Sequence, residues 1–257
     1  MISTALTIAG SDPSGGAGVQ ADLKTFHQHK VYGMAVLTLL TVQNTRGVRA
    51  VYPVAASNVA RQLEAVIADI PPGAAKTGAL GNEKIISAVA ACAGKFSFPL
   101  VVDPVMVSKH GAPLLYKSAV RVFIRKLLPH ATLVTPNLCE AEVLSGIRVS
   151  SLKAMEQAAR IIAGFGPGAV LVKGGHLKGE ALDLLYQDGR VHCFNAPRIK
   201  TRHTHGTGCT YSAAITAGLS CGKDLFTAIA SAKKFITKAI RTAPGLGHGV
   251  GPVNFFA

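Results

Sequence analysis

The residues best suited to chemistry form a turn, Gly206-Thr207-Gly208-Cys209, between a polar loop and an apolar stretch. Glycines let successive backbone N–H groups point the same way, and the start of a helix adds partial positive charge, so the turn predicts an anion hole. A cysteine at that place should have a lowered pKa. Cys209 could then accept a proton from a hydroxyl group while the hole holds a transferring phosphate. The motif alone leaves open a simpler interpretation, a helix-capping turn with a buried cysteine.

A second polar pair follows the apolar stretch at 132–134. Asn137 and Glu140 are three residues apart, so they face the same way on a first helical turn. An amide and a carboxylate so placed suit Mg²⁺ together with phosphate oxygens and bound water. The same spacing also predicts a capping box, with Asn137 as the N-cap and Glu140 at the third helical position. The two interpretations are compatible.

Two further charged residues stand at the ends of apolar stretches. Asp103 could lie on the magnesium side of a site or be an ordinary turn acid. Lys173 could bring a point charge to a phosphate or be a solvated lysine. The segment 105–113, polar at its centre, could close over a substrate or be an ordinary surface loop.

The glycine-rich loop at 10–18 supports a rival function. Gly16-x-Gly18-x-x-Ala21 resembles a dinucleotide fingerprint, which would make the protein an NAD-dependent oxidoreductase. The first glycine of that pattern lies too far beyond the preceding strand, and no acid follows the next strand to bind a ribose. We favour a loop whose backbone lies close to a small ligand. Asp22 then either presents its carboxylate to that ligand or is a surface acid.

The charge and the cysteine content of the chain indicate which class of ligand it binds and in which compartment it works. The chain has 27 basic and 13 acidic residues and a net charge of +14, which attracts anions. Its basic residues are scattered and form no RNA-binding signature, so we expect a phosphate-rich ligand and no nucleic acid. The five cysteines are odd in number and lack a C-x-x-C pair, which favours a reducing compartment, here the cytoplasm. We see neither a membrane span nor a secretion signal.

The elements that must position these residues alternate between strand and helix. Buried strands are predicted at 5–9, 34–42, 74–77, 100–102, 132–134 and 169–173, with a hairpin over 182–194. Helices are expected around 19–26, 59–70, 85–89, 120–128, 152–159, 209–219 and 225–240, the second of them capped by Ser57 or Asn58. Such units predict one α/β domain over residues 1–257, with a mostly parallel sheet covered on both faces.

Segments along nearly the whole chain resemble the hydroxymethylpyrimidine/phosphomethylpyrimidine kinases of the ribokinase-like superfamily. They are ALTIAGSDPSGGAGVQADLKT at 5–25, TVQNTRGV at 41–48, KTGALG at 76–81, VVDPVMVSKHGAPLL at 101–115, TPNLCEAE at 135–142, VKGGH at 172–176, APRIKTRHTHGTGCTYSAAI at 196–215 and GHGVGPV at 247–253. The resemblance implies a three-layer α/β/α fold and a homodimer. It also implies two ATP-dependent phosphorylations of 4-amino-5-hydroxymethyl-2-methylpyrimidine, to the monophosphate and then the diphosphate, for thiamine synthesis.

The resemblance also implies roles for individual residues. Those on the pyrimidine side are Gly10, Asp22, Gln43, Ala79 and Val105. Those on the nucleotide side are Asn137 and Lys173 for ATP, and Glu140 and Asp103 for Mg²⁺. The anion hole and base are Gly206, Thr207, Gly208 and Cys209.

The residue at 209 separates this chain from the sugar kinases of the superfamily, which carry Asp in that place. Cysteine there is usual in the pyrimidine kinases and in a similar cysteine-type pyridoxal kinase, which has a second cysteine in its flap. Residues 104–113 contain no cysteine, and Ser108 and His110 stand there. The resemblance therefore favours the pyrimidine enzyme, with pyridoxal kinase as the alternative.

Overall fold

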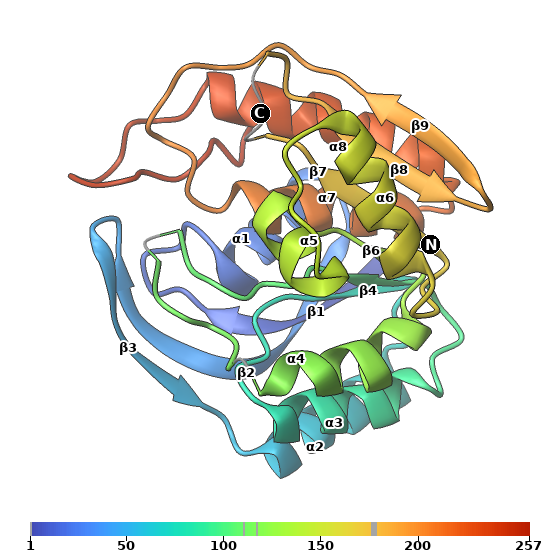
Figure 1. The fold of residues 1–257 in the computed structure, drawn as a ribbon. Coiled ribbons are helices and arrows are strands. Elements are labelled where there is room, and N and C mark those ends of the chain that lie inside the picture. Colours follow the sequence, from blue (N-terminus) through green and yellow to red (C-terminus); the bar gives the residue numbers. More distant parts are fainter. Residues whose placement is uncertain (1, 110, 117, 176–178) are drawn as a thin grey trace.

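The structure, a computed structural model of the chain, describes residues 2–109, 111–116, 118–175 and 179–257. Its centre is a nine-stranded sheet in the order β3-β2-β1-β4-β5-β6-β7-β8-β9 (Figure 1). The strands are β1 (Thr4–Ser11), β2 (Tyr32–Asn44), β3 (Gly47–Pro53), β4 (Ala74–Thr77), β5 (Leu100–Val102), β6 (Leu133–Val134), β7 (Ala169–Lys173), β8 (Asp183–Gln187) and β9 (Arg190–Phe194). In this order, each neighbouring pair from β2 to β7 is parallel. The pairs β2–β3, β7–β8 and β8–β9 are antiparallel.

Helices cover both faces of the sheet. They are α1 (Gly18–Gln28), α2 (Ala56–Asp69), α3 (Glu83–Ala93), α4 (Ala119–Val122), α5 (Leu138–Ser145), α6 (Leu152–Ala163), α7 (Thr207–Ser220) and α8 (Leu225–Arg241). Buried residues of α2 to α6 join one core cluster, and those of α1, α7 and α8 join the clusters on the other face. The three-layer fold with a mostly parallel sheet is therefore confirmed. In the part of the chain that the structure describes, no helix has the length and apolarity needed to cross a membrane.

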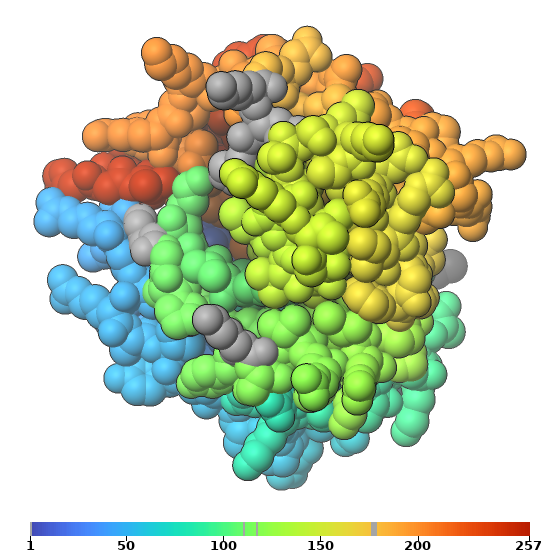
Figure 2. All heavy atoms as spheres, in the orientation of Figure 1, coloured from blue at the N-terminus to red at the C-terminus, as the bar shows by residue number. Residues whose placement is uncertain are grey.

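Because they are parallel, the carboxyl ends of β1, β4, β5, β6 and β7 lie along one edge of the sheet. Figure 2 shows a hollow in the surface between the green segment that follows β5 and the yellow-green α5. Dark blue atoms of the N-terminal part of the chain are visible at its bottom. Loops that are far apart in the sequence therefore meet at this hollow.

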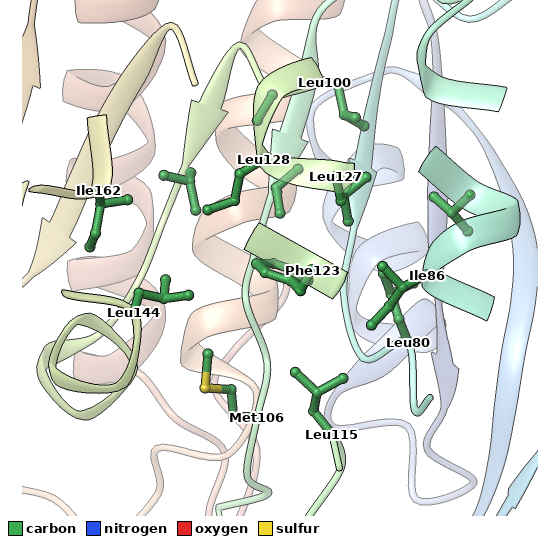
Figure 3. Close-up of a cluster of buried hydrophobic side chains, with 14 of the residues drawn as sticks. Leu80, Ile86, Leu100, Met106, Leu115, Phe123, Leu127, Leu128, Leu144 and Ile162 are labelled. Atoms are coloured by element: carbon green, nitrogen blue, oxygen red, sulfur yellow. The ribbon is translucent and has the colours of Figure 1, made fainter. Parts of the chain in front are cut away.

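The segment after α4 contributes large side chains to the core cluster that α2 to α6 share. The sequence pattern at 120–128 predicts one helix, but the chain passes from α4 into a π-helical turn at Phe123–Leu127 and a 3₁₀ turn at Leu128–His130. Pro129 cannot continue an α-helix, which accounts for the last change. Phe123, Leu127 and Leu128 lie together in the buried cluster (Figure 3).

The structure confirms several of the predicted strands but differs from the sequence predictions at β3 and at the start of α2. Strands β4, β5 and β7 have the predicted bounds, and β8 and β9 form the predicted hairpin around Asp188 and Gly189, both at positive φ. Strand β3 was not predicted, because it has no fully buried residue and so no apolar pattern. The cap predicted for α2 is wrong: the N-cap is Ala55, without a side-chain hydrogen bond.

The role of the π-helical turn gives a first prediction. Phe123 is 2% exposed, so Phe123→Ala leaves a cavity and should lower the free energy of unfolding by about 3–5 kcal/mol, measured by urea denaturation. The matched control is Phe256→Ala, since Phe256 is 86% exposed. That change should cost less than about 0.5 kcal/mol. Equal costs for the two variants would contradict the packing described here.

Candidate active site

The turn at 206–209 opens α7 and leaves two amides available. Gly206 is the N-cap with φ of 76°, and a Cβ there would collide with the carbonyl oxygen of Gly16, so only glycine fits. The amides of Thr207 and Thr210 donate to backbone carbonyls. No acceptor within the described residues takes the amides of Gly208 and Cys209, which are the second and third of the helix. Both residues are partly exposed.

An ion pair lies beside this turn. Lys173 Nζ is 2.9 Å from Asp103 Oδ1, and their side chains are 14% and 2% exposed. A Cβ on Gly208 would lie 3.6 Å from Lys173 Nζ and 3.7 Å from Asp103 Oδ2. Burial disfavours the charge of Lys173, but Asp103 and Glu140 outweigh it and raise the pKa of the ammonium group. The turn and a permanent positive charge therefore face the same space.

Asp103 is fully engaged by its neighbours. Besides Lys173, its carboxylate accepts hydrogen bonds from Thr135 Oγ1 at 3.1 Å and Ser212 Oγ at 3.2 Å. Burial alone would raise the pKa of Asp103, but Lys173 and Lys76 lower it, so the group is ionised. Sequence reasoning missed Thr135 and Ser212, although both belong to the segments that carry the family resemblance. The solvated-lysine and turn-acid alternatives are both wrong.

Asn137 and Glu140 form the predicted capping box. Asn137 Oδ1 accepts from the Glu140 amide at 2.9 Å, and Glu140 Oε2 accepts from the Asn137 amide at 2.8 Å. Burial raises the pKa of Glu140 to about 7, opposed by Lys173 and reinforced by Asp103. Its carboxyl group therefore holds its proton more tightly than that of an exposed glutamate.

Asp22 is neither a surface acid nor open to solvent. It is fully buried, and both its oxygens lie 2.8–2.9 Å from Lys76 Nζ on β4. Thr7 Oγ1 donates to it at 2.6 Å. Burial disfavours the charge of Lys76, but Asp22 outweighs it and raises the pKa of Lys76, so the pair is ionic. Its part in pyrimidine binding stays a prediction.

The pKa expected for Cys209 is wrong. Burial raises the pKa of its thiol to about 12, and the nearby carboxylates of Asp22 and Asp103 add to this rise. Lys76 and a hydrogen bond from the Gly18 backbone lower it, but not enough. Burial thus outweighs the positive end of the helix, so Cys209 is a protonated thiol at neutral pH.

The other residues assigned to the pyrimidine side lie at the ends of β1, β4, β5 and β2. Gly10 is buried in β1, while Ala79 and Val105 follow β4 and β5 and are partly exposed. Gln43, in β2, is partly exposed and lies 3.1 Å from Nε2 of His205. Adjacent strands thus bring the first three residues to one edge of the sheet, as the doubly covered fold requires.

The possible lid is described in part. Val107 and Pro113 bridge, and the Ser108 amide donates to the Ala112 carbonyl at 2.8 Å, so the ends of the segment form a turn. His110 lies outside the described residues, as does His176 of the VKGGH segment. Closure of this segment over a substrate stays a prediction.

Comparison with known proteins decides the family. A family model described as phosphomethylpyrimidine kinase matches residues 12–254. The chain belongs to this family. The hydroxymethylpyrimidine/phosphomethylpyrimidine kinase of Synechococcus elongatus is 45% identical over 254 residues, covering 98% of this chain and 97% of that protein. The chain is therefore a kinase, and the oxidoreductase interpretation of the first glycine loop is wrong.

Solved structures support the same fold. A phosphomethylpyrimidine kinase from Clostridium difficile has 43% identity and a TM-score of 0.82, covering 93% of this chain and 99% of its own. The pyridoxal kinase from Staphylococcus aureus in complex with AMP-PCP and pyridoxal has 38% identity and a TM-score of 0.91, covering 100% and 95%. The fold is thus shared between kinases of two substrate classes, so local residues must decide between them.

The buried Asp22–Lys76 pair gives a second prediction. Lys76→Met leaves the Asp22 carboxylate buried without its counter-ion and should lower the free energy of unfolding by about 3–5 kcal/mol. Urea denaturation measures this, with Lys84→Met as the control because Lys84 is exposed. Adding Asp22→Asn to Lys76→Met should restore part of the loss. A Lys76→Met variant as stable as Lys84→Met would contradict the ionic pairing.

Proposed function

We propose that the chain transfers the γ-phosphate of ATP to the hydroxymethyl group of 4-amino-5-hydroxymethyl-2-methylpyrimidine and then to the resulting monophosphate, for thiamine synthesis. Residues 1–257 act as a single kinase domain. The observation that carries the proposal is the pair of amides at Gly208 and Cys209 that have no acceptor within the described residues, in a turn that lies beside Lys173. Phosphoryl transfer depends mainly on positioning and on neutralising charge, and this arrangement offers both.

Each group of the turn has a part in holding the transferring phosphate. The amides of Gly208 and Cys209 donate to its oxygens, aided by the positive end of α7. Lys173 adds a full charge, and Asp103 keeps its ammonium group in place at 2.9 Å. Thr207 Oγ1 donates to the Thr204 carbonyl at 2.7 Å, so this hydroxyl shapes the turn. Asn137, beside Lys173 on the neighbouring strand end, belongs to the ATP side.

The residues present fit a Mg²⁺ ion on the Glu140 side. Mg²⁺ prefers carboxylate, phosphate and water oxygens, and it neutralises the charge of the ATP phosphates when bound. Glu140 would hold it, and a bound cation would lower the pKa of about 7 that burial gives this carboxyl group. Asp103 would not contact the ion directly but would hold Lys173 in place, since Lys173, Thr135 and Ser212 already donate to its oxygens.

Cys209 takes the proton of the substrate hydroxyl in the first step. Because burial raises the pKa of this thiol to about 12, only a small fraction of it is ionised at pH 7. In the second step the acceptor is a phosphate group that is already ionised near neutral pH. The second step therefore does not need the thiolate.

The unequal need for a base gives a third prediction. Cys209→Ala should slow the first phosphorylation by about 100-fold and the second by less than about 3-fold, measured as separate single-turnover rates. In the unchanged protein the first rate should rise about tenfold per pH unit from pH 7 to 9, because the thiolate fraction rises below its pKa. The variant's first rate should be flat over that range. Equal losses in both steps would mean that Cys209 acts by packing.

Product analysis tests the proposal as a whole. The protein is incubated with ATP, with or without Mg²⁺, and with the pyrimidine alcohol, its monophosphate, pyridoxal or a sugar. We expect ADP in step with pyrimidine phosphate and diphosphate, and only with Mg²⁺ present. Faster turnover of pyridoxal would favour the alternative, cysteine-type pyridoxal kinase, whose similarity is close. ADP formation without any of these acceptors would contradict the proposal.

The proposal includes a homodimer in the cytoplasm. The antiparallel pair β2–β3 exposes four large apolar side chains, which are Tyr32, Leu40, Val42 and Tyr52. Such side chains on one edge of a sheet suit a second copy of the chain. All five cysteines are free, in keeping with a reducing compartment. Light scattering in solution distinguishes the dimer from a monomer.

A further inference from the structure

One histidine connects the proposed pyrimidine side of the site to the turn at 206–209, which we call the phosphate turn. His205 is 3% exposed and directly precedes Gly206. Its Nε2 lies 2.7 Å from Asp12 Oδ2 and 3.1 Å from the side-chain amide of Gln43. Asp12 in turn accepts hydrogen bonds from Ser14 and from the Ala17 amide, which fixes the loop after β1. Three separate segments of the chain thus meet at one ring nitrogen.

That nitrogen either carries a proton and donates, or lacks one and accepts. Burial alone would raise the pKa of Asp12, but hydrogen bonds from His205 and Ser14 lower it, so Asp12 is an ionised acceptor. A bare Nε2 would set its lone pair against this carboxylate at 2.7 Å. His205 Nε2 therefore carries a proton and donates it toward Asp12.

The protonated Nε2 decides how the Gln43 amide lies. The two ends of an amide have the same shape, so their hydrogen-bond partners decide which end faces where. With Gln43 Nε2 at 3.1 Å from His205 Nε2, two donors face each other. Turning the amide by half a rotation puts Oε1 beside the imidazole N–H, where it accepts the longer arm of a hydrogen bond that the same proton shares with Asp12.

Thr41 fits the same turned orientation. Its Oγ1 donates its one proton to the Ser11 carbonyl at 2.9 Å and lies 3.4 Å from the other end of the Gln43 amide. That hydroxyl has lone pairs left for the amide NH₂ group but no second proton for an oxygen. Both of these contacts of the amide then join a donor to an acceptor.

We propose that His205, held by Asp12, is a positioning residue that locks the Gln43 amide with Oε1 toward the phosphate turn and so sets the orientation of the pyrimidine. This rests on the proposed function, in which Gln43 contacts the substrate. Gln43 keeps one Oε1 lone pair and one N–H for the ligand, an acceptor beside a donor. A 4-aminopyrimidine has the matching edge, an amino donor beside a ring-nitrogen acceptor.

The order of these two groups fixes where the reacting hydroxyl points. The amino group must lie on the Oε1 side, which is the His205 side. The hydroxymethyl group is on the carbon next to the one that bears the amino group, so it lies on that side too. Because His205 adjoins Gly206, this orientation carries the hydroxyl toward the turn at 206–209. An amide free to rotate would bind the ring in the opposite sense as well.

The fixed orientation of the Gln43 amide is tested with a substrate analogue in which the hydrogen-bond donor and acceptor are exchanged. The 4-oxo analogue of the pyrimidine alcohol carries a carbonyl acceptor beside a ring N–H donor. We expect kcat/KM for the 4-amino alcohol to exceed that for the 4-oxo analogue by at least about 100-fold in the unchanged protein, because mispaired polar groups are costly. His205→Leu should reduce this ratio to about 10-fold or less by raising KM for the 4-amino alcohol. The KM for ATP should change by less than about 3-fold.

Two further variants serve as controls. His205→Gln restores an N–H donor and should recover most of the ratio, whereas exposed His192→Leu should leave it unchanged. A His205→Leu variant with the full ratio would overturn the lock, as would equal loss in the leucine and glutamine variants. If the unchanged protein does not phosphorylate the 4-amino alcohol, the proposed function fails instead.

A measurement on the unchanged protein covers the case in which His205→Leu does not fold. The side-chain NH₂ protons of Gln43 are followed by ¹⁵N NMR while the 4-amino alcohol is added. We expect one of the two protons to move downfield, and the corresponding pyridine without that ring nitrogen to leave it in place. Equal shifts with both compounds would overturn the assignment.

Discussion

The site depends on the close approach of two glycine turns, because the carbonyl of Gly16 occupies the space where any side chain at 206 would lie. That contact fixes the left-handed conformation of Gly206 and hence the direction in which α7 starts. The amides of Gly208 and Cys209 have no acceptor in the described part of the chain, since the first residues of a helix have no carbonyl partners within it. The parallel sheet supplies the rest, by ending β5 and β7 beside the same turn.

Around the turn, charges are buried in pairs. Asp103 with Lys173 and Asp22 with Lys76 each bring a cation and an anion out of water together, which is tolerable only because hydrogen bonds from Thr135, Ser212 and Thr7 complete them. The carboxylates of Asp22 and Asp103, which belong to different segments of the chain, also raise the pKa of the Cys209 thiol. Burial is the main reason that the thiol stays protonated, and the two carboxylates add to its effect while Lys76 opposes it.

Sequence reasoning succeeded where one segment carries its own signal. The bounds of β4, β5 and β7, the capping box of Asn137 and Glu140 and the position of the glycine turn before α7 are all local patterns. It failed where the outcome depends on contacts between distant segments. Lys76 was not singled out because nothing in its own strand shows that Asp22 lies beside it. Likewise, the pKa of Cys209 depends on residues over 100 positions away in the chain, at 22 and 103.

Amide NMR of Gly208 and Cys209 tests most directly whether this turn binds phosphate. In ¹⁵N-labelled protein, a non-hydrolysable ATP analogue should move both amide protons downfield and slow their exchange with solvent, because each gains a charged acceptor. The account would be contradicted if these two amides kept their shifts and exchange rates while amides elsewhere in the chain responded to the analogue.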